Sequence, residues 1–156
     1  MNAVFCDGSV RKIGYGIDEL DGTVYAFHYN AHTGDLKRKQ SLSALPPGFA
    51  GKPSAADLHI TPDGKFLYGS ERTSSTLAGF SVDAATGTLT AIGSVPTEKQ
   101  PRGFNIDSTG RYLLAVGQLS HGLSSYSIDP ASGKLTKLKE YPMGKNPNWI
   151  EFADLP

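Results

Sequence analysis

The sequence predicts an all-β protein built from β-propeller blades, each made of four antiparallel strands. Three observations support this prediction: a repeat of about 46 residues, tight-turn residues that divide each repeat, and the lack of helical periodicity. Eighteen glycines and ten prolines among 156 residues favour many short strands joined by turns. No segment has apolar residues at a spacing of 3.6 over ten or more residues, which argues against a two-helix solenoid of similar period.

The repeat is clearest around Phe27, Phe80 and Tyr126, which lie 53 and then 46 residues apart. Each of these aromatic residues belongs to an alternating segment that ends in Asn or Asp. A Thr-Gly or Ser-Gly turn follows, and the next strand then opens with leucine; the three segments are residues 19–36, 72–89 and 118–135. Glycine after threonine or serine supplies the positive φ that a tight hairpin needs.

A second hairpin precedes the aromatic residue in the later repeats. Residues 59–68 match residues 105–114, with Asp63-Gly64 and Thr109-Gly110 as the turns. Each unit therefore contains four strands, and we predict approximate repeat units 13–58, 59–104 and 105–150 within a single partial domain that covers residues 1–156. Residues 40–54, which include Leu-Pro-Pro-Gly-Phe, are predicted to be an extended loop inserted into the first blade, which would explain the longer first spacing.

The length bears on how such a propeller closes. At about 46 residues a blade, the chain holds roughly three blades, whereas propellers close with about four to eight. We therefore expect a partial propeller, of about three blades, with open sheet edges. Such edges favour self-association, so a homo-oligomer that completes a ring is one expectation.

One predicted ring of polar residues follows the second strand of each unit. Glu19, Arg72 and Gln118 each lie eight residues before the aromatic residue, so a carboxylate, a guanidinium and an amide should share one rim. An arginine can bind an anionic group through two hydrogen bonds. A carboxylate can act as a general base toward water.

A second ring is predicted at His59, Asn105 and Glu151, which are spaced 46 and 46 residues apart. We expect these residues early in the first strand of each unit, which lines the central channel of a propeller. Asp57 lies two residues before His59, where it is placed to orient the imidazole or to cap a turn.

Composition narrows the range of functions. Fifteen basic residues balance fifteen acidic ones, which argues against an electrostatic nucleic-acid binder. No apolar run is long enough to span a membrane. The single cysteine, Cys6, excludes an internal disulfide framework and favours a reducing, cytoplasmic compartment. No zinc-ligand spacing, phosphate-binding loop or dinucleotide fingerprint is present, so we predict no metal and no cofactor.

Two ordered segments point to a family. Residues 55–68, Ala-Ala-Asp-Leu-His-Ile-Thr-Pro-Asp-Gly-Lys-Phe-Leu-Tyr, precede residues 100–107, Gln-Pro-Arg-Gly-Phe-Asn-Ile-Asp. Together they resemble the C-terminal part of the propeller-type 6-phosphogluconolactonases, a family that also includes carboxy-muconate cyclases. Residues 17–20, 71–72 and 116–118 support the resemblance, which extends over residues 17–151.

The resemblance implies a seven-bladed propeller that hydrolyses the lactone ring of a phosphorylated sugar lactone in the pentose phosphate pathway. It makes Glu19 the counterpart of the acidic residue in an Asn-Glu-Leu motif, although Asp18 precedes it here. Arg72 matches the family's active-site arginine, and His59 completes the predicted catalytic set. The residues predicted to bind substrate are Arg102, Asn105 and Gln118.

The resemblance also implies roles for these residues. Glu19 would activate water, Arg72 would bind the anionic group or stabilise the oxyanion, and His59 would hold substrate or tune Glu19. The family's Pro-Arg-His motif has no match before Glu19, where Arg11 is the only arginine.

Two other functions fit the same residues. The chain could be a non-catalytic propeller fragment or a self-associating interaction module. It could also be a cyclase that acts on a carboxylated muconate, because such an enzyme uses the same fold and the same residue types. The expected partner of either enzyme is a small anionic lactone, with no nucleic acid and no membrane.

Overall fold

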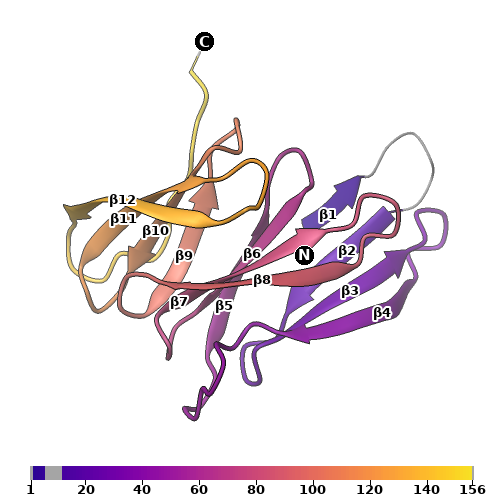
Figure 1. Ribbon diagram of the computed structural model, residues 1–156, viewed down its shortest axis with the longest axis horizontal. Coiled ribbons are helices and arrows are strands. Elements are labelled where there is room, and N and C mark those ends of the chain that lie inside the picture. The colour runs from indigo at the N-terminus through magenta and orange to yellow at the C-terminus, as the bar shows by residue number, and fades with distance from the viewer. Residues whose placement is uncertain (1, 6–11, 156) are drawn as a thin grey trace.

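The computed structural model describes residues 2–5 and 12–155, and these residues form three four-stranded antiparallel sheets (Figure 1). In each sheet the strands lie side by side in chain order, which confirms the predicted blades. Blade 1 contains β1 (Asn2–Phe5), β2 (Lys12–Ile17), β3 (Thr23–Tyr29) and β4 (Leu36–Ser43). Blade 2 contains β5 (Ala55–Ile60), β6 (Phe66–Glu71), β7 (Thr76–Val82) and β8 (Leu89–Pro96). Blade 3 contains β9 (Pro101–Ile106), β10 (Tyr112–Gly117), β11 (Gly122–Ile128) and β12 (Leu135–Pro142).

The sheets have the predicted period but a different phase. The predicted units begin at residues 13, 59 and 105, and these positions lie inside β2, β5 and β9. The long loop covers residues 44–54 and connects β4 to β5, so it joins two blades and is not inserted into one. It is seven residues longer than the link between β8 and β9, and this difference accounts for the longer first spacing.

The blades pack face to face around two apolar clusters. Every residue of β6 is buried, and the side chains of its first three residues alternate between the two clusters. Leu67 points to blade 1, and Phe66 and Tyr68 point to blade 3. The first cluster contains Ile13, Tyr15, Val24, Ala26, Ala44, Leu67, Ala78, Phe80 and Leu89. The second contains Phe66, Tyr68, Leu77, Phe104, Ile106, Leu113, Ala115, Tyr126 and Ile128.

A tyrosine in the second strand of one blade bonds to a turn of the next blade. The Tyr15 hydroxyl donates to the Gly87 carbonyl at 2.7 Å, and the Tyr68 hydroxyl donates to the Gly133 carbonyl at 2.6 Å. The two glycines have φ of 68° and 69°, as the Thr-Gly and Ser-Gly pattern predicts. A Cβ atom on either glycine would also lie closer than 3.0 Å to a side chain of the preceding blade. Glycine is therefore needed for two reasons, its backbone conformation and the close approach of the blades.

Several side chains on the outer strand of blade 3 are exposed in this chain. Leu138 and Tyr141 of β12 are 53% and 44% exposed. The described residues contain no helix that is long and apolar enough to cross a membrane. Cys6 and Arg11 lie outside the described residues.

Candidate active site

The loops that follow β2, β6 and β10 lie at the same end of the three blades, with the links between blades. Glu19, Arg72 and Gln118 are the first or second residues of these loops. The link between β4 and β5 approaches the same end, because the Ala55 N–H donates to the Glu19 carbonyl at 3.0 Å. This arrangement brings a carboxylate and a guanidinium from adjacent blades together.

Glu19 and Arg72 form an ion pair between blade 1 and blade 2. Arg72 Nη2 bonds to Glu19 Oε1, and Arg72 Nε donates to the Ser54 carbonyl at 3.1 Å. The Arg72 side chain is 11% exposed, whereas the Glu19 side chain is 60% exposed. The guanidinium is therefore held by the protein, and the carboxylate that it holds faces outward.

A buried carboxylate that the sequence analysis did not single out as a site residue supports this pair. Glu71 is fully buried at the end of β6 and accepts N–H groups from Ser54, Thr73 and Ser74. Although burial raises the pKa of Glu71, the hydrogen bonds from Ser74, Ser54 and Thr73 lower it below its usual value. Glu71 thereby anchors both the loop that carries Arg72 and the Ser54 carbonyl that Arg72 binds. The Glu71-Arg72 motif marks the position, but no sequence signal shows that Glu71 is buried.

His59 lies near the end of β5, not early in the strand as expected. Its Nε2 pairs with Asp57 Oδ2 at 3.1 Å, so Asp57 orients the imidazole. The His59 ring also meets the Phe104 ring edge to face at 4.9 Å between centroids. Four residues of extended strand separate His59 from Ala55, which is roughly 13 Å. His59 is therefore set apart from Glu19. The geometry does not allow the imidazole to contact the Glu19 carboxylate and tune its basicity directly.

Asp57 also joins the two inner strands. Its Oδ2 accepts the Phe104 N–H of β9 at 3.2 Å, and its Oδ1 accepts the Leu58 N–H at 2.9 Å. Burial raises the pKa of Asp57. The hydrogen bond and charge of His59, together with the two N–H groups, lower the pKa by more than burial raises it, so the net shift is downward.

The other predicted residues contact the segment that follows β12. Asn105, also late in its strand, donates from Nδ2 to Glu151 Oε2 at 2.6 Å. Gln118 Nε2 bonds to Asn148 Oδ1. The Arg102 guanidinium lies over the Trp149 ring, 5.9 Å from its centroid. Arg102, Asn105 and Gln118 therefore face this segment, which follows blade 3 in the chain.

A cavity of about 470 Å³ runs between blade 1 and β5. Asp18, the neighbour of Glu19, lines it together with Asp57 and His59. The remaining lining residues are Tyr15, Gly16, Ile17, Tyr25, Phe27, Ala56 and Leu58. Apolar walls with a few polar groups are typical of a small-molecule site. Within the described part of the chain, no group of three or more His, Cys, Asp or Glu side chains could hold a metal ion.

Similarity to known proteins shows the family of the chain. The family described as lactonase, seven-bladed β-propeller, matches residues 4–152. The chain belongs to this family. A 6-phosphogluconolactonase of Pectobacterium atrosepticum is 48% identical over 99 residues, which is 64% of this chain and 30% of that protein. A 6-phosphogluconolactonase of Serratia proteamaculans is 50% identical over 96 residues, 62% of this chain and 29% of that protein.

A solved structure shows the same fold. The periplasmic gluconolactonase of Pseudomonas aeruginosa superposes with a TM-score of 0.87 at 30% identity, over 99% of this chain and 42% of that one. The chain thus spans about two fifths of the length of this structural relative, and the matches with the two curated relatives cover less than a third of their length.

Proposed function

We propose that this chain acts in the hydrolysis of a phosphorylated sugar lactone, as a 6-phosphogluconolactonase of the pentose phosphate pathway. The observation that carries the proposal is the ion pair between an exposed Glu19 carboxylate and a held Arg72 guanidinium. The family membership and the names of the curated relatives support the same reaction.

The two groups suit the two needs of lactone hydrolysis. Glu19 removes a proton from a water molecule as the water oxygen bonds to the lactone carbonyl carbon. Arg72 stabilises the negative charge that develops on the carbonyl oxygen or binds the substrate's phosphate. The ring C–O bond then breaks and the ring oxygen takes up the proton from Glu19. The carboxylic acid that forms releases its own proton to solvent, which leaves a free carboxylate. We assign His59 to substrate contact, because it lines the cavity and lies apart from Glu19.

The test is turnover of 6-phosphogluconolactone by the purified chain and by Glu19→Gln. This change keeps the size of the side chain and removes its basicity, so we expect the rate to fall by roughly 10²–10⁴. The matched control is Asp21→Asn, in the same turn, where an asparagine oxygen can still accept the Thr23 N–H that Asp21 accepts at 2.8 Å. Equal rates for the chain and for Glu19→Gln contradict the assignment.

Two further outcomes separate the other functions. Turnover of a carboxylated muconate lactone in place of the sugar lactone supports the cyclase. No turnover of either compound, with the chain folded, supports an interaction module.

Two predictions go beyond the catalytic residues. Self-association through open blade edges predicts a mass in solution above that of one chain, and a folded monomer contradicts it. The cytoplasmic location stays a prediction, since the relative from Pseudomonas aeruginosa is named as periplasmic.

A further inference from the structure

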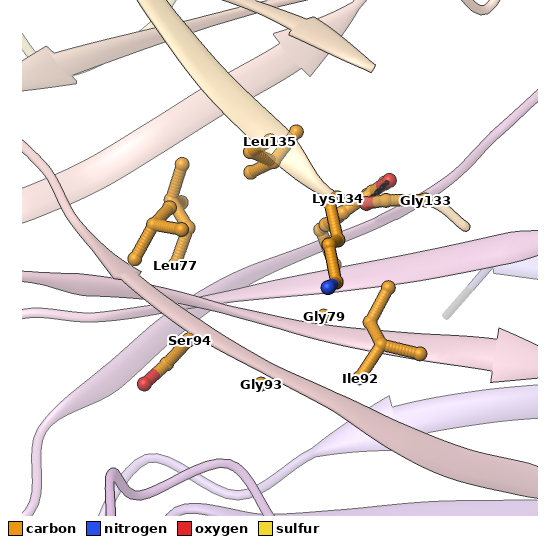
Figure 2. Close-up of a pocket in the computed structure, with 10 residues that line it drawn as sticks. Leu77, Gly79, Ile92, Gly93, Ser94, Gly133, Lys134 and Leu135 are labelled. Atoms are coloured by element: carbon orange, nitrogen blue, oxygen red, sulfur yellow. Dashed lines mark hydrogen bonds between the residues drawn. The ribbon is translucent and has the colours of Figure 1, made fainter. Parts of the chain in front are cut away.

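A second cavity lies between blade 2 and blade 3 (Figure 2), and its lining includes none of the candidate active-site residues. Its volume is about 240 Å³. Blade 2 supplies Tyr68, Leu77, Gly79, Ile92, Gly93, Ser94 and Val95, and the turn before β12 and its first residue supply Gly133, Lys134 and Leu135.

The open space of this cavity lies beside Gly93. Gly79 of β7 pairs with Gly93 of β8, next to an irregularity in the ladder. The same place in blade 1, 53 residues earlier, holds Ala26 paired with Gln40, next to the same irregularity. A Cβ atom on Gly93 would meet no atom within 4 Å, so the space beside it is open.

Gln40 shows what closes the equivalent space between blades 1 and 2. Its Nε2 donates to the Leu89 carbonyl at 2.8 Å, and its Oε1 accepts the Leu89 N–H at 2.7 Å. One carboxamide thus satisfies both backbone groups at the start of the outer strand β8.

Leu135 presents the same two backbone groups at the start of β12. Leu89 of β8 pairs with Val82 of β7. The Val82 N–H points away from β8 and donates to the Lys65 carbonyl. Leu135 pairs in the same way with Ile128, whose N–H bonds to the Arg111 carbonyl. Such pairs are not hydrogen-bonded to each other, so the N–H and C=O of both leucines point away from the neighbouring strand. Among residues 12–155, no side chain bonds to these two groups of Leu135.

We propose that this cavity binds a small apolar molecule with a primary carboxamide. The carboxamide takes the place that Gln40 fills at the other interface, donating to the Leu135 carbonyl and accepting the Leu135 N–H. The apolar body packs against Leu77, Ile92 and Val95. Figure 2 shows the Lys134 side chain extending from the turn toward Gly79, where its aliphatic part covers the ligand.

The test is a titration of the ¹⁵N-labelled chain with benzamide, followed by amide NMR shifts. We expect saturable shifts at Leu135, Gly79 and Gly93, with a dissociation constant on the order of millimolar for a ligand of this size. Toluene lacks the donor and the acceptor, and benzoate lacks the donor. Binding of toluene or benzoate as tight as that of benzamide overturns the carboxamide assignment, and so does the absence of shifts with benzamide.

Matched variants test the place of binding. Gly93→Gln adds the side chain that blade 1 uses to close this space, and we expect it to abolish the benzamide shifts. Gly93→Ala imposes the same backbone strain at φ 113° without filling the cavity, so it should retain them. Unchanged binding in a folded Gly93→Gln protein overturns the site. If Gly93→Gln does not fold, the comparison of benzamide with toluene and benzoate in the unchanged chain still decides the proposal.

Discussion

The two interfaces between blades are built alike but filled differently. At both, a buried tyrosine bonds to a turn glycine of the next blade, and that glycine packs closely on the preceding blade. Between blades 1 and 2, Gln40 bridges to Leu89, whereas between blades 2 and 3 glycine leaves a cavity at the same place. The comparison teaches that the shared residues set how blades stack, while single differences decide where space remains.

The largest expected effect concerns the turn glycines. Gly133→Ala and Gly87→Ala combine positive φ with overlap onto Phe66 or Ile13, so each should lower the free energy of unfolding by about 2–5 kcal/mol. Gly34 is the equivalent residue of blade 1, with φ 80° and no atom within 4 Å of an added Cβ. Gly34→Ala should therefore lose only about 1–2 kcal/mol. Urea unfolding measures all three, and equal losses would show that close packing of blades contributes nothing.

The next effect concerns the bridge that only one interface has. Gln40→Ala removes both hydrogen bonds to Leu89 and should lower the free energy of unfolding by about 1–3 kcal/mol. It should also create a second benzamide site, reported by a shift of the Leu89 amide. Lys139→Ala is the control at the equivalent place in blade 3, where the loss should stay below about 1 kcal/mol. A folded Gln40→Ala protein with no new shift at Leu89 contradicts the comparison of the two interfaces.

The smallest expected effect concerns the inner strands and depends on pH. The pKa of Asp57 is lower in the folded chain than its ordinary value of 3.8, so its ionisation stabilises the fold above that pH. The stabilisation is lost as the pH falls through the folded pKa. In unfolding experiments from pH 7 to pH 3, the stability difference between the chain and Asp57→Asn should shrink below about pH 4. A difference that stays constant across this range would mean that the Asp57 charge does not link β5 to β9.

Much of the fold follows from patterns in the sequence. The period around Phe27, Phe80 and Tyr126 predicts three blades, and the Thr-Gly and Ser-Gly pairs predict turns that the structure contains. The period alone does not show where a sheet begins, so the predicted units were out of phase and residues 40–54 were wrongly placed inside a blade. Because the start of each sheet was not known, His59 and Asn105 were predicted near the beginning of their strands, whereas they lie near the end.

The candidate site was predicted in part. Equivalent positions in successive repeats placed Glu19 and Arg72 on one rim, and the structure joins them. Asn148, the partner of Gln118, lies 46 residues after Arg102, so the period alone could have singled it out. The support from Glu71 could not be predicted in this way, because it depends on backbone N–H groups that meet only after the loop has folded.

By itself, the sequence determined the strands, the turns and the order of the blades, because these depend on residues within one repeat. Only the tertiary structure decided which groups meet across blades. Tyr68 lies 65 residues from Gly133, and Gln40 lies 49 residues from Leu89. Such contacts depend on how one sheet packs on the next. That packing decides that Gly133 needs glycine for space as well as for φ, and that Gly93 leaves a cavity where Gln40 forms a bridge.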